Sequence, residues 1–256
     1  MAEKNPDRRK VAWVTGASSG IGRALSLRLA DDGWQVAISA RGGEALAEIA
    51  GQRPGRIHSF PLDVTDLDAV KATCAAIREA MGSLDRAVFC AGTYKRDSIS
   101  HFDSAAFKTM VDLNIMGTAH CLEAVLPDMI ARGKGQIGVV SSVAGYNGLP
   151  GGGFYGATKA ALINLCEALY PGLQAKGIDL SIINPGFVAT PLTAKNDFPM
   201  PFMISPEEAA DSIASGLDAK RYEIIFPWKM ALSIRFLHRL PQSLRFAITR
   251  RMLRKS

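Results

Sequence analysis

The sequence predicts an α/β protein, in which one doubly wound parallel sheet forms a single domain with a basic, amphipathic helical tail at its C-terminus. Short apolar runs alternate with helical segments as far as residue 226, which is typical of parallel strands joined by helical crossovers. Most runs are apolar throughout, as expected of strands covered on both faces. Residues 220–256 carry ten Lys or Arg and one acid, whereas the other 219 residues carry 20 basic and 23 acidic side chains. We therefore expect a nearly neutral body and a basic tail.

Each element is expected where its residue pattern is clearest. The seven expected strands are residues 11–15, 35–40, 56–61, 85–90, 135–141, 179–184 and 222–226. Six helices are expected between them, at residues 21–32, 44–50, 67–81, 103–132, 155–176 and 206–215. Asp66 and Ser205 are placed to act as N-caps, and Gly177 to end the helix before it. No repeat or linker interrupts the series, so we expect residues 1–226 to form the domain and residues 227–256 a helical extension of it.

The composition excludes several classes of protein. Of the 256 residues, 48% are hydrophobic and 21% charged, which is too apolar for disorder and sufficient for one large core. The four cysteines form no C-x-x-C pair and the four histidines no ligand spacing, so no metal and no dithiol motif is expected. The polar N-terminus and the glycine-rich uncharged stretch 135–158 resemble neither a signal peptide nor a membrane span. The basic charge is local and no nucleic-acid motif accompanies it. We expect a cytoplasmic protein that does not bind nucleic acid.

A glycine-rich turn follows the first expected strand. It consists of Thr15, Gly16, Ala17, Ser18, Ser19, Gly20, Ile21 and Gly22. Such a turn lets the backbone approach a pyrophosphate, which lies on the N-terminus of the following helix. Taken alone, the glycines are also compatible with an ordinary tight turn. Their spacing resembles the TGxxxGxG fingerprint of the short-chain dehydrogenase/reductase family, which has a Rossmann-type fold.

Further motifs of this family occur in order along residues 10–226. They are Asp63-Val64 after the third expected strand, Ala91-Gly92 after the fourth, Asn114 in a helix, Ser142 thirteen residues before Tyr155, the Y-x-x-x-K motif from Tyr155 to Lys159, and the P-G-x-x-x-T segment from Pro185 to Thr190. Where the family usually has two asparagines before Ala-Gly, this chain has Phe89 and Cys90, so the usual asparagine contacts are not expected here. The resemblance implies a dinucleotide-binding and catalytic domain.

The resemblance also implies a role for each motif. The residues expected to bind the nicotinamide dinucleotide are Gly16, Ser18, Ser19, Gly20, Ile21, Gly22, Arg41, Asp63, Val64, Ala91, Gly92, Asn114, Tyr155, Lys159, Pro185, Gly186, Val188 and Thr190. Those expected to act in catalysis are Asn114, Ser142, Tyr155 and Lys159, with Asn114 helping to relay protons.

The residue types at these positions suit proton exchange with an alcohol or ketone. Tyr155 and Lys159 are four apart on an expected helix, so both project from one face. A free tyrosine has a pKa near 10, and a nearby ammonium favours the phenolate and lowers that pKa. Ser142, at the carboxyl end of a strand, is placed to hydrogen-bond a carbonyl oxygen beside the tyrosine. A tyrosine–lysine pair alone is equally compatible with an ordinary helix surface.

Arg41 indicates which dinucleotide is preferred. Folds that select NAD usually place an acid at the end of the second strand, where it binds the ribose 2′-hydroxyl, while an arginine accommodates a 2′-phosphate. Here Ala40 replaces the acid and Arg41 follows. NADP(H) is therefore expected in preference to NAD, although a solvated surface arginine would look the same.

These features predict an NADP(H)-dependent oxidoreductase that interconverts a carbonyl and a secondary alcohol. Residues 191–205, hereafter the lid segment, carry Phe198, Met200, Phe202 and Met203, which indicates either a hydrophobic substrate or packing on the body. The alternatives are a soluble 3-oxoacyl thioester reductase, a reductase of sterol-like or long-chain lipid ketones, and a sensor that binds NADP(H) without catalysis. The resemblance implies a homodimer or homotetramer built on the long helices at 103–132 and 155–176.

The tail contains an amphipathic helix. On a helical wheel Met230, Leu232, Ile234, Phe236, Leu237 and Leu240 gather on one broad side, and Arg235, His238 and Arg239 gather opposite, with Lys229 as an exception. Pro241 suits the start of a second helix, whose apolar and basic residues are less well separated. The tail is expected either to lie on an anionic membrane surface or to pack its apolar side on the body.

Overall fold

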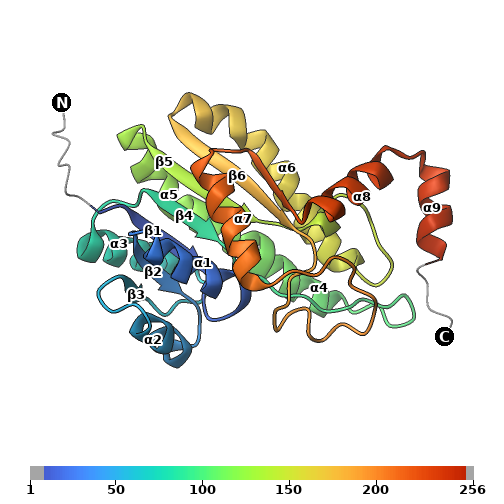
Figure 1. The fold of residues 1–256 in the computed structure, drawn as a ribbon, viewed down its shortest axis with the longest axis horizontal. Coiled ribbons are helices and arrows are strands. Elements are labelled where there is room, and N and C mark those ends of the chain that lie inside the picture. Colours follow the sequence, from blue (N-terminus) through green and yellow to red (C-terminus); the bar gives the residue numbers. More distant parts are fainter. Residues whose placement is uncertain (1–8, 252–256) are drawn as a thin grey trace.

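One sheet of seven parallel strands organises the computed structural model, which describes residues 9–251 (Figure 1). The strands are β1 (Val11–Thr15), β2 (Gln35–Ser39), β3 (Ile57–Ser59), β4 (Arg86–Phe89), β5 (Gly135–Val140), β6 (Ile178–Pro185) and β7 (Glu223–Phe226). Their spatial order is β3-β2-β1-β4-β5-β6-β7. The chain therefore starts at the centre, winds outward to β3, and returns to wind the other way to β7. The reversal between β1 and β4 is the switch point at which doubly wound folds bind ligands.

Helices cover both faces of this sheet and divide the core into two layers. On one face lie α1 (Gly20–Asp31), α2 (Gly43–Gly51) and α7 (Pro206–Asp218). On the other lie α3 (Leu67–Met81), α5 (Gly117–Arg132) and α6 (Gly153–Ala175). The strands between the layers are almost fully buried, for example Val11–Thr15 at every position. The doubly wound α/β prediction is confirmed.

Helix ends follow the expected local chemistry. The Asp66 carboxylate accepts a hydrogen bond from the Ala69 amide, and Ser205 forms a reciprocal capping box with Glu208. Gly177 has a φ of +74°, which glycine adopts without strain after a helix. These expected ends are confirmed. The third strand is shorter than expected.

The long helix expected at 103–132 is interrupted. The chain forms α4 (Ser104–Met110), then one π-helical segment at Val111–Met116, and then α5. Such segments insert one residue into a helix and often occur at functional sites. Asn114 lies inside this segment and is completely buried.

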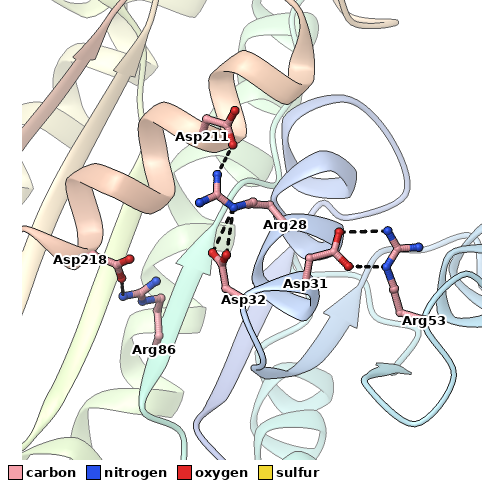
Figure 2. A network of polar contacts seen from close by, with 7 residues as sticks. All are labelled: Arg28, Asp31, Asp32, Arg53, Arg86, Asp211 and Asp218. Carbon is pink, nitrogen blue, oxygen red and sulfur yellow. Dashed lines mark hydrogen bonds and ion pairs between the residues drawn. The ribbon is translucent and has the colours of Figure 1, made fainter.

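Polar contacts join helices at the amino end of the sheet (Figure 2). Arg28 of α1 pairs with Asp32 and reaches across to Asp211 of α7. Arg86, at the start of β4, is only 3% exposed and pairs with Asp218 at 2.7 Å. The exposed pairs contribute little to stability, whereas the pair at Arg86 neutralises a buried charge. These contacts lie away from the carboxyl end of the sheet, where folds of this kind bind ligands.

The tail forms two further helices, α8 (Trp228–Arg239) and α9 (Gln242–Arg250). The broad apolar side expected for α8 splits in two: Met230, Ile234 and Leu237 are buried on the body, but Leu232 and Phe236 are each 64% exposed. The split arises because apolar residues span more of the helix circumference than the body can cover. α9 buries no residue and projects from the body in Figure 1.

The described chain has no helix with the length and apolarity needed to span a bilayer. The expected domain limits extend to residues 1–8 and 252–256, which lie outside the described residues.

Candidate active site

The turn after β1 has a geometry that only glycine supports. Gly16 and Gly20 have φ values of +66° and +53°. A Cβ atom on Gly16 would lie 2.7 Å from the backbone of Ala91, and one on Gly22 would lie 2.4 Å from the Gly16 carbonyl oxygen. Ser19 precedes α1 but its side chain does not cap the helix, and no acid lies in the first turn. The amides of that turn are therefore available to an anion, which fits the phosphates of a dinucleotide.

A cavity of about 400 Å³ extends from this turn along the carboxyl ends of the strands. Of the residues expected to bind the dinucleotide, the following line it: Gly16, Ser18, Ser19, Gly20, Ile21, Gly22, Arg41, Asp63, Val64, Ala91, Gly92, Tyr155, Lys159, Pro185, Gly186, Val188 and Thr190. Asn114 does not. The structure thus brings together segments that follow six strands, β1 to β6. We name this space the dinucleotide cavity.

Arg41 and Asp63 lie at one end of the dinucleotide cavity. Hydrogen bonds from the amide and the hydroxyl of Thr65 lower the pKa of the Asp63 carboxyl, and the positive charge of Arg41 lowers it further. Asp63 is therefore ionised near neutral pH, and Arg41 is the exposed cation beside it.

Ser142 and Tyr155 face each other at the other end of the dinucleotide cavity. Tyr155 is the third residue of α6, and Ser142 follows β5, where its hydroxyl accepts a hydrogen bond from the Ala144 amide. Burial raises the pKa of the Tyr155 phenol to about 12, while its hydrogen bond with Ser142 acts in the opposite direction. The phenol therefore holds its proton near neutral pH.

Lys159 lies one turn beyond Tyr155 and is also buried. Its ammonium donates a hydrogen bond of 2.9 Å to the Val140 carbonyl and lies 5.6 Å from the centre of the Tyr155 ring. Burial lowers the pKa of Lys159 to about 8. Burial penalises the charged form of both groups and is the largest influence on Tyr155, whose pKa is raised and not lowered as expected; the role given to Lys159 stays a prediction.

Asn114 lies behind the wall of the dinucleotide cavity. Its side-chain oxygen accepts a hydrogen bond from the Thr93 amide at 2.8 Å, and its nitrogen donates to the Thr93 carbonyl and to the Thr158 hydroxyl, both at 3.0 Å. A Cβ atom on Gly92 would lie 3.3 Å from the Asn114 oxygen. These contacts make Asn114 a positioning residue for the loop after β4 and for α6.

A second cavity, of about 900 Å³, meets the first at Ser142 and Tyr155. We name it the apolar cavity. Its walls come from the loops after β4, β5 and β6, from the lid segment and from the tail, and include Leu149, Phe187, Phe198, Phe202, Met230, Ile234 and Leu237. Of the four apolar lid residues singled out from the sequence, Phe198 and Phe202 line it.

Several residues of this cavity were missed by the sequence reasoning. Tyr94 lies beside Tyr155, with ring centres 5.3 Å apart, and its position just after β4 could have indicated it because ligands bind at strand ends. Met230, Ile234 and Leu237 lacked such a signal, since apolar tail residues pack equally well elsewhere.

The buried Lys159 gives a testable pH dependence of stability. Its pKa of about 8 lies below the 10.5 of an ordinary lysine, so between these values the unfolded chain binds more protons than the folded protein. Lys159 therefore destabilises the fold at neutral pH, and this cost disappears as the pH rises from about 8 to 10.5. Lys159→Met should raise the free energy of unfolding at pH 7 by on the order of 2 kcal/mol. Urea unfolding of both proteins at pH 7 and pH 10 checks this, and an advantage that does not shrink at pH 10 would contradict it.

A dinucleotide cavity at the switch point, joined to an apolar cavity at a serine and a tyrosine, defines a nucleotide-binding oxidoreductase of the Rossmann class. Comparisons with known proteins agree. The family model described as short chain dehydrogenase matches residues 10–199. An uncharacterized oxidoreductase of Myxococcus xanthus is 37% identical over 246 residues, which is 95% of this chain and 97% of the relative.

Solved structures give the same result. A short-chain dehydrogenase from Streptomyces avermitilis has a TM-score of 0.82 and 28% identity, covering 94% of this chain and 96% of the other. A variant of actinorhodin polyketide ketoreductase with NADPH has a TM-score of 0.77 and 26% identity, covering 88% and 96%. This chain belongs to the short-chain dehydrogenase family and is an NAD(P)-dependent oxidoreductase.

Proposed function

We propose that the protein is an NADP(H)-dependent oxidoreductase that interconverts a carbonyl and a secondary alcohol on a hydrophobic substrate. One observation carries the proposal: Ser142 and Tyr155 line both the dinucleotide cavity and the apolar cavity. Gly186, Leu192 and Thr193 also line both cavities, so a substrate in the apolar cavity would meet the dinucleotide beside the Ser142 and Tyr155 hydroxyls. At that junction a side-chain hydroxyl can supply a proton to the same carbonyl group that faces the dinucleotide.

The side chains support carbonyl reduction as follows. When bound, NADPH supplies a hydride to the carbonyl carbon. Ser142 donates a hydrogen bond to the carbonyl oxygen and fixes its orientation. Tyr155, protonated because burial raises its pKa, donates its phenol proton to that oxygen as negative charge develops there. A protonated Lys159 favours the phenolate that remains. In alcohol oxidation the same proton returns to Tyr155.

The walls of the apolar cavity support a hydrophobic substrate. Aromatic and aliphatic side chains of the lid segment and of α8 line the space beyond Tyr155, together with Leu149 and Phe187. Binding there removes apolar substrate surface from water, which is the main source of affinity in such pockets. This surface favours sterol-like or long-chain lipid ketones over the alternative, a soluble 3-oxoacyl thioester.

The assay that tests the proposal is oxidation of NADPH with ketones of graded chain length. We expect kcat/KM to rise with the apolar length of the ketone. Turnover of 3-oxoacyl thioesters alone would favour the thioester reductase. Binding of NADPH without turnover of any ketone or alcohol would favour a non-catalytic sensor instead.

Arg41 supports NADP(H) as the preferred dinucleotide. It is exposed, it lines the dinucleotide cavity, and its charge acts on the neighbouring Asp63. An added phosphate on the ribose would place a dianion within reach of this guanidinium.

Arg41→Asp should reverse the preference between the two dinucleotides. The substitution removes the cation and places a second carboxylate near Asp63, so a 2′-phosphate would meet two negative charges. We expect kcat/KM for NADPH to fall by about 100-fold while that for NADH falls by less than about tenfold. Steady-state kinetics with both dinucleotides measures this. A native protein that already prefers NADH would contradict the assignment.

Three further features belong to the proposal. We propose that the protein forms a homodimer or homotetramer through the helices from α4 to α6. We propose a cytoplasmic location. We also propose that the basic tail makes peripheral contact with membranes.

A further inference from the structure

Exposed apolar side chains are concentrated at one end of the molecule. Eight of the twelve large apolar residues exposed in residues 9–251 belong to the lid segment or the tail. Clustered exposure of this kind marks an interaction surface, whereas single exposed apolar residues do not. The eight are Phe202, Met203, Trp228, Leu232, Phe236, Leu244, Phe246 and Ile248. The Lys229 ammonium lies over the rings of both Phe202 and Trp228, at 5.8 and 5.7 Å, which makes the lid and α8 neighbours.

The outer face of α8 is an apolar stripe bordered by cations. Trp228, Leu232 and Phe236 are spaced four residues apart and lie on one face of the helix, opposite the buried Met230, Ile234 and Leu237. At 100° per residue Lys229 falls beside this stripe, and Arg239 falls on it, three residues beyond Phe236. Long cationic side chains can lie along apolar groups while their charges reach polar headgroups.

The charge of the tail is complementary to an anionic surface. No acid follows Glu223 in the sequence. Arg235 is paired with Glu223, whereas Lys229, Arg239, Arg250 and Arg251 are exposed. A stripe containing tryptophan and phenylalanine with exposed cations fits the interface of a bilayer that contains anionic lipid.

The apolar cavity reaches this same face. Phe236 and Ile248 are exposed on the tail, and both also line the cavity that ends at Tyr155. Arg251 lines it as well. If a bilayer lay against α8 and α9, a molecule dissolved in its apolar layer could therefore enter the cavity directly from the lipid, without passing through water.

We propose that the outer face of α8 and α9 binds reversibly to anionic lipid bilayers, and that lipid-soluble ketones pass from the bilayer into the apolar cavity past Phe236 and Ile248. The second part rests on the proposed function. The first part extends the membrane contact proposed above for the tail and is independent of the catalytic proposal, since binding to lipid requires no turnover.

The first test is co-sedimentation of the full chain with vesicles, without substrate. We expect binding to phosphatidylcholine vesicles containing about 30% phosphatidylglycerol at low salt, and its loss in neutral vesicles or at high salt. Trp228→Gln/Leu232→Gln and Leu244→Gln/Phe246→Gln should each weaken binding by at least about tenfold. The matched control Ile99→Gln/Ile130→Gln removes exposed apolar groups elsewhere and should bind as the native protein does.

Three outcomes would overturn the lipid assignment. They are an absence of binding to anionic vesicles, equal binding by native and tail-substituted proteins, and a lipid-free oligomer that dissociates on Trp228→Gln/Leu232→Gln. The last outcome would assign the stripe to a second copy of the chain. Sedimentation of each protein without vesicles measures it.

The second test compares a water-soluble ketone with a long-chain ketone embedded in anionic vesicles. The tail substitutions lie outside both cavities, so turnover of the soluble ketone should stay within about twofold of the native rate. Turnover of the embedded ketone should fall about tenfold, in step with binding. An embedded-ketone rate that stays native in variants that no longer bind would overturn transfer from the bilayer. Failure of the native protein on every soluble ketone would count against the proposed function alone.

Discussion

Tyr155→Phe is expected to lower kcat for carbonyl reduction by about 10³-fold while leaving NADPH affinity within about threefold of the native value. The substitution removes one hydroxyl, which under the proposed mechanism is the proton donor, and preserves the ring that packs against Tyr94. The residual rate would come from solvent protons and from positioning by Ser142. Single-turnover kinetics and a fluorescence titration with NADPH separate the two quantities.

Tyr94→Phe is the matched control for this experiment. It removes a hydroxyl from the same cavity, one that donates only to the Gly151 carbonyl at 3.3 Å. We expect kcat to change by less than about fivefold, because a long hydrogen bond to a loop contributes little. If both variants lose activity equally, the loss reflects the shape of the cavity, and the role given to Tyr155 is wrong.

Asn114→Leu should give the second large effect, on stability as well as turnover. Leucine is close in size but leaves the Thr93 amide and carbonyl without their partners inside the protein. Each unsatisfied buried group costs about 1–3 kcal/mol, so we expect the free energy of unfolding to fall by about 3 kcal/mol. Because Thr93 adjoins the loop that lines both cavities, kcat should also fall, by on the order of 100-fold.

Asn114→Asp serves as the comparison. Burial favours the protonated carboxyl, which keeps an acceptor for the Thr93 amide and one donor in place of two, so this variant should lie between the native protein and the leucine variant. Urea unfolding and kcat measured on all three proteins check the order. A leucine variant as stable as the native protein would show that Asn114 does not hold this loop.

The parts of the fold that depend on local chemistry could be predicted from the sequence. The turn at Gly16 requires a positive φ and a close backbone contact. Only glycine meets both requirements readily, so the spacing of the glycines predicts the turn. The four-residue spacing of Tyr155 and Lys159 fixes their common helix face in the same way. Both features are properties of a few consecutive residues.

Features that depend on distant contacts could not be predicted. The π-helical segment contains Asn114, whose partners Thr93 and Thr158 are 21 and 44 residues away. The choice of which apolar half of α8 is buried depends on the position of β7 and the loop beyond β5, because both halves look alike on a helical wheel. The pKa of Tyr155 depends on how deeply the tertiary structure buries it, and the spacing to Lys159 carries no such information.

The apolar cavity is built almost entirely from segments that belong to no strand. Its walls are the loops after β4, β5 and β6, the lid segment, and α8 with α9, whereas the dinucleotide cavity lies directly on the strand ends. Substitutions in these walls leave the hydrogen bonding of the sheet unchanged. During evolution, or by deliberate exchange of segments, the molecules accepted at Tyr155 can therefore diverge while the sheet and the coenzyme chemistry are inherited intact.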